Sequence, residues 1–154
     1  MEFPLPADNG NEWPLRRAAV TLALIAEARD VIGAFDRAGL RCAALKGLSV
    51  HARGLYAGPD ERPMNDVDLL VDPARCRDAS DVLRDLGYRP HDRRLDDPAR
   101  LRAYLRASGD LNWIHRERPW AMIDLHWNLA RCDRFRGVIR LPAGEFINRS
   151  SPAP

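Results

Sequence analysis

The sequence predicts an α+β domain: a small mixed β-sheet with helices packed mainly on one face and a long helix at the N-terminal end. Three observations support this. Apolar residues recur at spacings of three and four over a long N-terminal stretch, which is typical of an amphipathic helix. Short apolar runs bounded by glycine and proline follow, as expected of buried strands. Two alternating runs further on are typical of a hairpin.

Length and composition are those of an ordinary globular domain. The 154 residues suit one domain, and 45% hydrophobic with 30% charged residues indicates neither disorder nor a membrane-spanning protein. The net charge of +2 is too balanced to predict a nucleic-acid partner. No apolar run approaches about 18 residues and no signal peptide is evident, so we expect a cytoplasmic protein without membrane association. We expect residues 1–12 to be a flexible N-terminus, 13–147 to form the single domain and 148–154 to be a loose tail.

The first predicted element is a helix over residues 13–40, which Gly39 would end. A buried strand is predicted in RCAALKG, residues 41–47, and a short helix in LSVHARGLY, residues 48–56, ending near Gly54. The spacing assigns the following residues to the apolar face of the long helix: Leu15, Ala18, Ala19, Leu22, Ile25, Ala26, Ile32 and Phe35.

The second predicted strand is DVDLLV, residues 66–71, which follows a turn-rich segment. Asp72 and Pro73 are predicted to begin the next helix, with aspartate as N-cap and proline at the first helical position. We expect this helix to end at Gly87.

The C-terminal half is predicted to contain a further helix and several strands. YRP, residues 88–90, is a short strand, and DDPARLRAYLRAS, residues 96–108, is a surface helix with a capping aspartate. LNWIH, residues 111–115, and AMIDLHWNL, residues 121–129, are predicted to form an antiparallel hairpin. RGVIRL, residues 136–141, is predicted as a weak strand.

Two aspartates stand one residue apart at the start of the second predicted strand. Side chains alternate along a strand, so Asp66 and Asp68 would project to the same face, with Cα atoms roughly 6 to 7 Å apart. Like charges at this spacing repel unless a cation lies between them or one is protonated, and a divalent metal is the simplest solution. The alternative is that Asp66 caps a turn and Asp68 pairs with an arginine.

A third aspartate lies in a later strand that is predicted to be largely buried. Asp124 is flanked by Ile123 and Leu125, and a buried carboxylate needs a partner such as a metal or an arginine. His126 would share its face and could orient Asp124 or contact substrate, although a hydrogen-bonded structural histidine explains it equally well.

The segment LKG ends one strand and begins a helix. Gly47 would let the backbone approach a ligand, and amides at the start of the helix can hold a phosphate. Such a pattern is weak alone, and its value comes from its order before the aspartate pair and the third acid.

The order LKG, RPMNDVDLLVD, GYRP and IDLHW resembles the nucleotidyltransferase-fold superfamily typified by polymerase beta, in particular its bacterial branch of uncharacterised nucleotidyltransferase family proteins. The resemblance covers roughly residues 15–130. It implies that Asp66 and Asp68 are metal ligands and that Asp124 is the third catalytic carboxylate, which also holds metal.

The resemblance implies transfer of a nucleoside monophosphate from a nucleoside triphosphate to a hydroxyl of a small molecule, peptide or protein, with release of pyrophosphate. The cofactor would be two Mg²⁺ ions, with Mn²⁺ as a substitute. The turn common in the superfamily is Gly-Ser, whereas here Lys46 and Gly47 precede Ser49, so Lys46 and Ser49 would meet the triphosphate. Arg62 would contact a phosphate, or would be an ordinary surface residue.

Two other functions use the same residues. In the first, the chain is a non-catalytic nucleotide-fold module that binds or regulates through a partner protein; the altered turn favours it, whereas the three acids favour the enzyme. In the second, the acids serve a metal-dependent phosphohydrolase, in which activated water replaces the acceptor hydroxyl.

Overall fold

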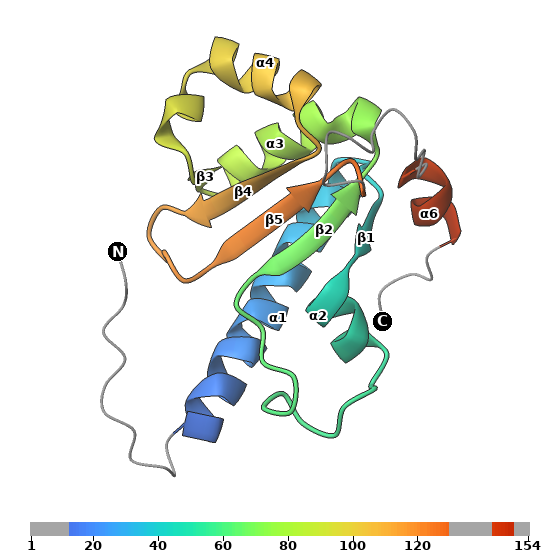
Figure 1. Cartoon of the computed structure of the whole chain (residues 1–154), viewed down its shortest axis with the longest axis vertical. Helices are drawn as coiled ribbons and strands as arrows, with labels where there is room; N and C mark the ends of the chain where they lie inside the picture. The colour runs from blue at the N-terminus through green and yellow to red at the C-terminus, as the bar shows by residue number, and fades with distance from the viewer. Residues whose placement is uncertain (1–12, 130–142, 150–154) are drawn as a thin grey trace.

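The computed structural model describes residues 13–129 and 143–149, which fold into a five-stranded mixed sheet with five helices (Figure 1). The strands are β1 (Cys42–Ala44), β2 (Val67–Val71), β3 (Tyr88–Pro90), β4 (Asp110–His115) and β5 (Met122–His126). The helices are α1 (Trp13–Arg37), α2 (Lys46–Ala52), α3 (Cys76–Asp85), α4 (Pro98–Ala107) and α6 (Ala143–Arg149), with 3₁₀ turns η1 (Pro73–Arg75) and η2 (Arg93–Asp96).

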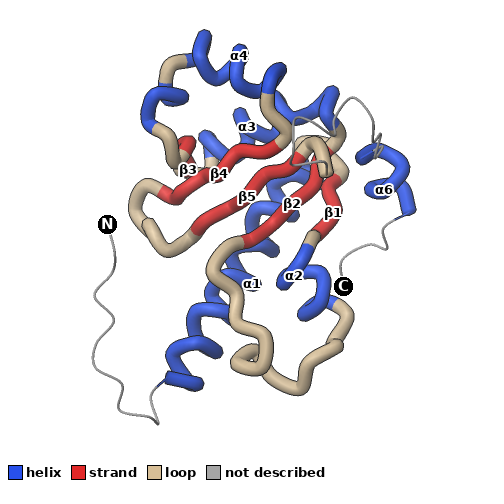
Figure 2. The backbone as a smooth tube through the Cα atoms, viewed as in Figure 1, coloured by secondary structure: helices blue, strands red, loops and turns tan. Residues whose placement is uncertain are grey.

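The sheet has the strand order β1-β2-β5-β4-β3, so two strands far apart in the sequence lie side by side at its centre (Figure 2). β2 and β5 are parallel, whereas every other neighbouring pair is antiparallel. The parallel register places Asp68 directly opposite Asp124. The predicted mixed sheet is therefore confirmed, and its parallel pair is what brings the two aspartates together.

The two faces of the sheet have different roles. Helices α1 and α3 cover one face (Figure 1). That face carries residues such as Leu69 and Leu125, which are fully buried in the main core. Because side chains alternate, the opposite face carries Asp68, Asp124 and His126. Helices thus cover mainly one face, as predicted.

The small helix α6 packs on the other face of the sheet, where it contacts β1 and β2. Ala143 and Ile147 form a second apolar cluster there with Leu70 and Ala43. This helix was not among the predicted elements. Helix α6 therefore covers this face of the sheet at Leu70. Asp68 and Asp124, on the same face, are not part of the second apolar cluster.

The long N-terminal helix is confirmed, and Gly39, with a φ of +65°, follows its end. Its buried side was predicted only in part: Phe35 is fully buried as expected, but other predicted positions are exposed. Leu15 and Leu22 are 73% and 56% exposed, whereas Leu24 and Val31 are buried. The 25 residues of α1 span about 37 Å, about twice the length of a five-residue strand, so its N-terminal part extends beyond the sheet (Figure 1).

The remaining short elements agree with the sequence to within a few residues. Asp72 accepts a hydrogen bond from the Ala74 amide at 2.8 Å, but the element it caps is η1, which leads into α3. Asp97 caps α4 through the Arg100 amide at 2.8 Å, and β4 pairs with β5 as the predicted hairpin. The second strand begins at Val67, so Asp66 precedes it. The strand predicted over 136–141 lies outside the described residues.

A buried polar cluster joins α1 to the far edge of the sheet. Glu27 accepts hydrogen bonds from the Tyr88 hydroxyl at 2.6 Å and from Arg118 at 2.8 Å. Burial alone would raise the pKa of Glu27, but these two donors outweigh it and hold the pKa below its usual range. The Glu27 carboxylate therefore has two side-chain donors within the fold. None of the helices in the described ranges is long and apolar enough to span a membrane.

Candidate metal centre

Three buried side chains with metal-binding atoms meet at the centre of the sheet. Asp68 comes from β2, and Asp124 and His126 come from β5. One oxygen or nitrogen of each lies within 4.8 Å of the others, and all three residues are at most 4% exposed. The sequence placed these residues on buried strands, and the parallel register of β2 and β5 makes them one group.

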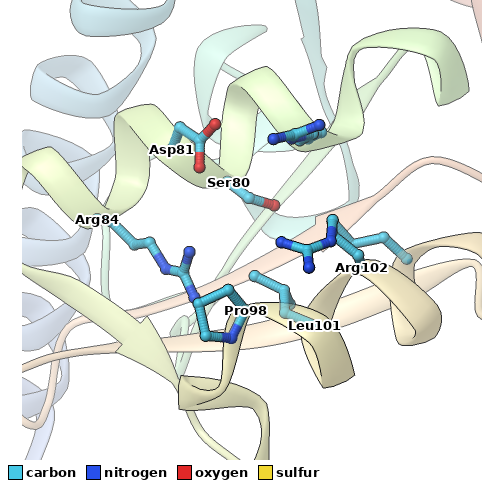
Figure 3. Close-up of a pocket in the computed structure, with 8 residues that line it drawn as sticks. Ser80, Asp81, Arg84, Pro98, Leu101 and Arg102 are labelled. Carbon is cyan, nitrogen blue, oxygen red and sulfur yellow. The ribbon is translucent and has the colours of Figure 1, made fainter.

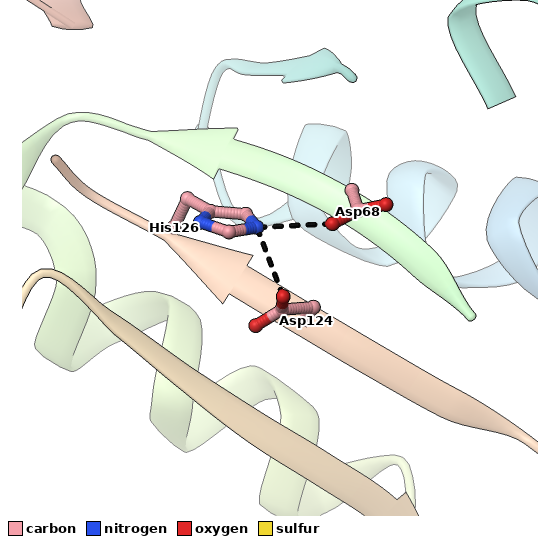
Figure 4. Close-up of side chains that lie close together, drawn as sticks. All are labelled: Asp68, Asp124 and His126. Atoms are coloured by element: carbon pink, nitrogen blue, oxygen red, sulfur yellow. Dashed lines mark hydrogen bonds and ion pairs between the residues drawn. The ribbon is translucent and has the colours of Figure 1, made fainter. Parts of the chain in front are cut away.

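The imidazole of His126 directs one nitrogen toward both carboxylates (Figure 4). Its Nε2 atom is 3.0 Å from Oδ1 of Asp68 and 3.1 Å from Oδ2 of Asp124. One nitrogen therefore contacts both acids, which is the position a shared cation would take between them. These contacts fit both interpretations of His126: a residue that orients Asp124, and a hydrogen-bonded structural histidine.

Lys46 is the second cationic side chain at this group. Its Nζ atom contacts Oδ1 of Asp68, while about half of the Lys46 side chain remains exposed. The backbone of Lys46 has a φ of +44°, in the left-handed region, which costs a residue other than glycine about 1 to 2 kcal/mol. Lys46 thus combines a left-handed backbone with a contact to a buried carboxylate.

The charges of these residues perturb one another. Burial alone would raise the pKa of Asp68, but contacts from His126 and Lys46 outweigh it and hold the pKa below its usual range. Burial alone would lower the pKa of His126, but hydrogen bonds from its ring to Asp124 and Asp68 raise the pKa to about 9. The group therefore carries cationic charge beside its acids near neutral pH.

Asp66 lies next to this group without belonging to it. It precedes β2, is partly exposed and is not one of the three residues whose ligand atoms converge within 4.8 Å in the described chain. Burial and the negative charge of Asp68 raise the pKa of Asp66. Repulsion from the Asp68 carboxylate disfavours the charged form of Asp66.

The three remaining residues predicted for the phosphate site lie on α2 or on the segment before β2. Gly47 packs against Met64, and a Cβ atom there would stand 3.0 Å from the Met64 Cγ. The hydroxyl of Ser49 donates to the carbonyl of Lys46 at 3.1 Å. Arg62 is exposed, and its carbonyl oxygen lies 2.7 Å from Nε2 of His51. Glycine at position 47 is thus explained by close packing.

Two features of the site were not predicted from the sequence: the contact of Lys46 and the position of Asn112. The contact between Lys46 and Asp68 depends on how α2 lies against β2, which no local pattern reveals. Asn112 of β4 stands opposite Asp124 in the antiparallel register and is exposed. The alternation in DLNWIH could have placed Asn112 on this face once the hairpin register was known.

The donor set of the group fits a divalent cation. Asp68 and Asp124, which are paired across β2 and β5, supply hard oxygen ligands of the kind that Mg²⁺ and Mn²⁺ bind. The negative charges of both carboxylates contribute to raising the pKa of Asp66. His126 adds a nitrogen donor, which suits Mn²⁺ better than Mg²⁺. In this structure, the positive charges that contact Asp68 are those of Lys46 and of protonated His126.

The stability of the metal-free protein should depend on the protonation of His126. Because the folded protein raises the pKa of this group from 6.5 to about 9, its stabilising effect is complete below pH 6.5 and is lost as pH rises through about 9. We therefore compare the unaltered protein with His126→Gln in the presence of a chelator. The difference between their free energies of unfolding should decrease as the pH rises from 6.5 to above about 9.

Nuclear magnetic resonance titration of the His126 ring checks the cause directly. Asp124→Asn removes one of the two carboxylates and should move the pKa of His126 down. A pKa near that of a free histidine in the unaltered protein would contradict the ion-pair geometry.

Comparison with known proteins gives one match. A family model described as "Uncharacterised nucleotidyltransferase" matches residues 15–152 of the chain. No curated protein and no solved structure matches significantly. The family model covers every described element from the first turn of α1 to α6.

Proposed function

Because this chain belongs to the uncharacterised nucleotidyltransferase family, we propose that it moves a nucleoside monophosphate from a nucleoside triphosphate to a hydroxyl of a small molecule, peptide or protein and releases pyrophosphate. The observation that carries this proposal is the buried pair of Asp68 and Asp124, opposite each other on parallel strands with two cationic side chains in contact. Two buried carboxylates on neighbouring strands can supply oxygen ligands to one divalent cation.

Asp68 and Asp124 would hold a divalent cation together with Asp66, and His126 could contribute a nitrogen. When bound, two Mg²⁺ or Mn²⁺ ions would neutralise the phosphates and stabilise the departing pyrophosphate. Asp66 is the more accessible of the two aspartates in the DVD motif, so it suits an ion that arrives with the nucleotide.

Lys46 suits a role with the triphosphate. In this structure its ammonium group contacts Asp68, but the side chain is half exposed and can turn outward. A cation on Asp68 would replace its charge there, and Lys46 could then pair with phosphate oxygens. Ser49, one turn along α2, and Arg62, on the exposed segment before β2, are the further proposed phosphate contacts.

Asp124 is the proposed residue for orienting and deprotonating the acceptor. Asp124 is buried on the polar face, but its register partner Asn112 on β4 is exposed, and we propose that the acceptor approaches over Asn112. The acceptor oxygen would form a bond to the α-phosphorus, its proton would pass to Asp124, and the bond to the pyrophosphate oxygen would break. The net charge of +2 favours acceptors other than nucleic acid, and we place the reaction in the cytoplasm.

Nucleotides labelled at the α or γ phosphorus test this function against its alternatives. The purified protein is incubated with each of ATP, GTP, CTP and UTP, with Mg²⁺ or Mn²⁺, and with fractions of a bacterial lysate as acceptors. Nucleotidyl transfer moves the α label into an acceptor and releases the γ label as pyrophosphate.

Two other results would contradict the proposal. Labelled inorganic phosphate without labelled acceptor would identify a phosphohydrolase. Metal-dependent binding measured by calorimetry, without any label transfer, would favour the non-catalytic module.

A further inference from the structure

A cavity with an arginine-rich lining lies on the helix-covered side of the sheet. It has a volume of about 430 Å³ and is bordered by η1, the start of α3, α4 and the residue that follows β5. A smaller cavity of about 80 Å³ lies between α3 and α4 (Figure 3). The two cavities share Arg77, Arg102 and Leu105 in their linings. The larger cavity lies in the size range of small-molecule sites.

The lining of the two cavities carries an excess of positive charge. Arg77, Arg102 and Arg106 border the larger cavity, whose described lining includes no carboxylate. Arg84 and Asp81 border the smaller one. None of these four arginines forms an ion pair with a carboxylate of the described chain, although Arg75 nearby is paired with Asp78. The described linings of the two cavities therefore contain four arginines and one carboxylate.

The cavity also has a fixed apolar wall. Leu105 and Trp127 are 7% and 4% exposed, so each presents only an edge to the cavity. The indole nitrogen of Trp127 donates to the carbonyl of Ser108 at 2.9 Å, which holds the ring in place. An apolar wall beside several guanidinium groups suits a ligand with an anionic group and an apolar or ring-shaped part.

This cavity is separate from the candidate metal centre. Trp127 follows His126 directly, but its side chain belongs to the core on the α1 and α3 side, whereas His126 lies on the polar face. The sheet therefore stands between the two sites. The nucleotidyl-transfer proposal assigns no role to Arg77, Arg102 or Arg106.

We propose that this cavity binds the phosphate ester of a small organic molecule about the size of a nucleoside monophosphate. The planar guanidinium group matches phosphate oxygens in a two-pronged contact, and Arg102 and Arg106, four residues apart, lie on the same side of α4. A single-stranded nucleic acid fits less well, because bases need exposed aromatic faces for stacking and Trp127 is buried.

Calorimetry in the presence of a chelator tests the proposal with AMP, phenyl phosphate, inorganic phosphate and adenosine as probes. We expect AMP and phenyl phosphate to bind and adenosine not to bind. The double variant Arg102→Gln with Arg106→Gln should weaken AMP binding at least about 10-fold, since it removes two charge-assisted contacts. Arg100→Gln, on the same helix but outside the cavity lining, is the matched control and should bind AMP unchanged.

Asp68→Asn separates the two sites. If AMP occupies the arginine cavity, this variant binds it as the unaltered protein does, whatever happens to nucleotidyl transfer. Loss of AMP binding in Asp68→Asn, or normal binding in the double arginine variant, would overturn the proposal. Inorganic phosphate binding as tightly as the esters would limit the ligand to free phosphate and refute the ester. Tighter binding of a single-stranded RNA oligonucleotide, lost in the double variant, would refute the small-molecule class.

Discussion

Asp68→Asn should weaken metal-dependent binding of nucleoside triphosphate about 100-fold or more and abolish nucleotidyl transfer. Even residues that only support metal ligands change metal affinity by about 10- to 100-fold when replaced, and Asp68 is a candidate ligand. Asparagine keeps the shape of the side chain but removes the negative charge that pairs with Lys46 and His126. Calorimetry with Mn²⁺ and the preferred nucleotide measures the effect.

Asp85→Asn is the matched control for this substitution. Asp85 is the last residue of α3 and is exposed, so the same chemical change there should leave nucleotide binding as it is. Thermal unfolding of both variants verifies that they fold. Equal binding by Asp68→Asn and the unaltered protein would exclude the buried aspartates as the metal site.

Leu24→Ala should reduce the free energy of unfolding by about 2 to 5 kcal/mol, because it empties a fully buried position between α1 and the sheet. Since domains of this size are stable by only about 5 to 15 kcal/mol, such a loss is a large part of the total. Urea denaturation followed by circular dichroism measures it.

Leu22→Ala on the same helix makes the same chemical change and should alter stability by no more than about 0.5 kcal/mol. Leu22 is 56% exposed, although its spacing assigned it to the apolar face. A large loss of stability in Leu22→Ala, with a small loss in Leu24→Ala, would show that α1 packs on the sheet through the other side.

The error in the face of α1 has a clear physical origin. Apolar residues are present on more than one side of the helix between Ala18 and Ile25, so periodicity alone does not select the buried side. Selection comes from the sheet, which is shorter than the helix and contacts its C-terminal part through Leu24, Val31 and Phe35.

Local signals were sufficient for most of the short elements. Asp72 with Pro73 and Asp97 with Pro98 are start signals that act through their own neighbouring amides, so they are readable without the rest of the fold. The alternating runs of β4 and β5 are joined by a short turn, which brings them together through local geometry. Helix α6 packs on strands that are far away in the sequence, and its few apolar residues did not predict a helix.

The candidate site was predicted in part. Strand alternation placed Asp124 and His126 on one face, and the DVD motif placed Asp68 beside Asp66. In the structure, Asp68 forms a buried group with Asp124 and His126. Asp66 precedes β2 and is not a member of that group. The metal-binding and catalytic roles of Asp66, Asp68, Asp124 and His126 stay predictions. So do the roles of Lys46, Gly47, Ser49 and Arg62 in binding nucleotide.

The sequence by itself determined the α+β class, the caps and turns and the residue types that point to metal-assisted nucleotidyl transfer, because these depend on neighbours within a few positions. Only the tertiary structure decided that β2 pairs in parallel with β5, that Asp68 meets Asp124 and His126, and that Lys46 contacts Asp68. Parallel pairing joins strands 50 or more residues apart, and its register is set by how the whole core packs.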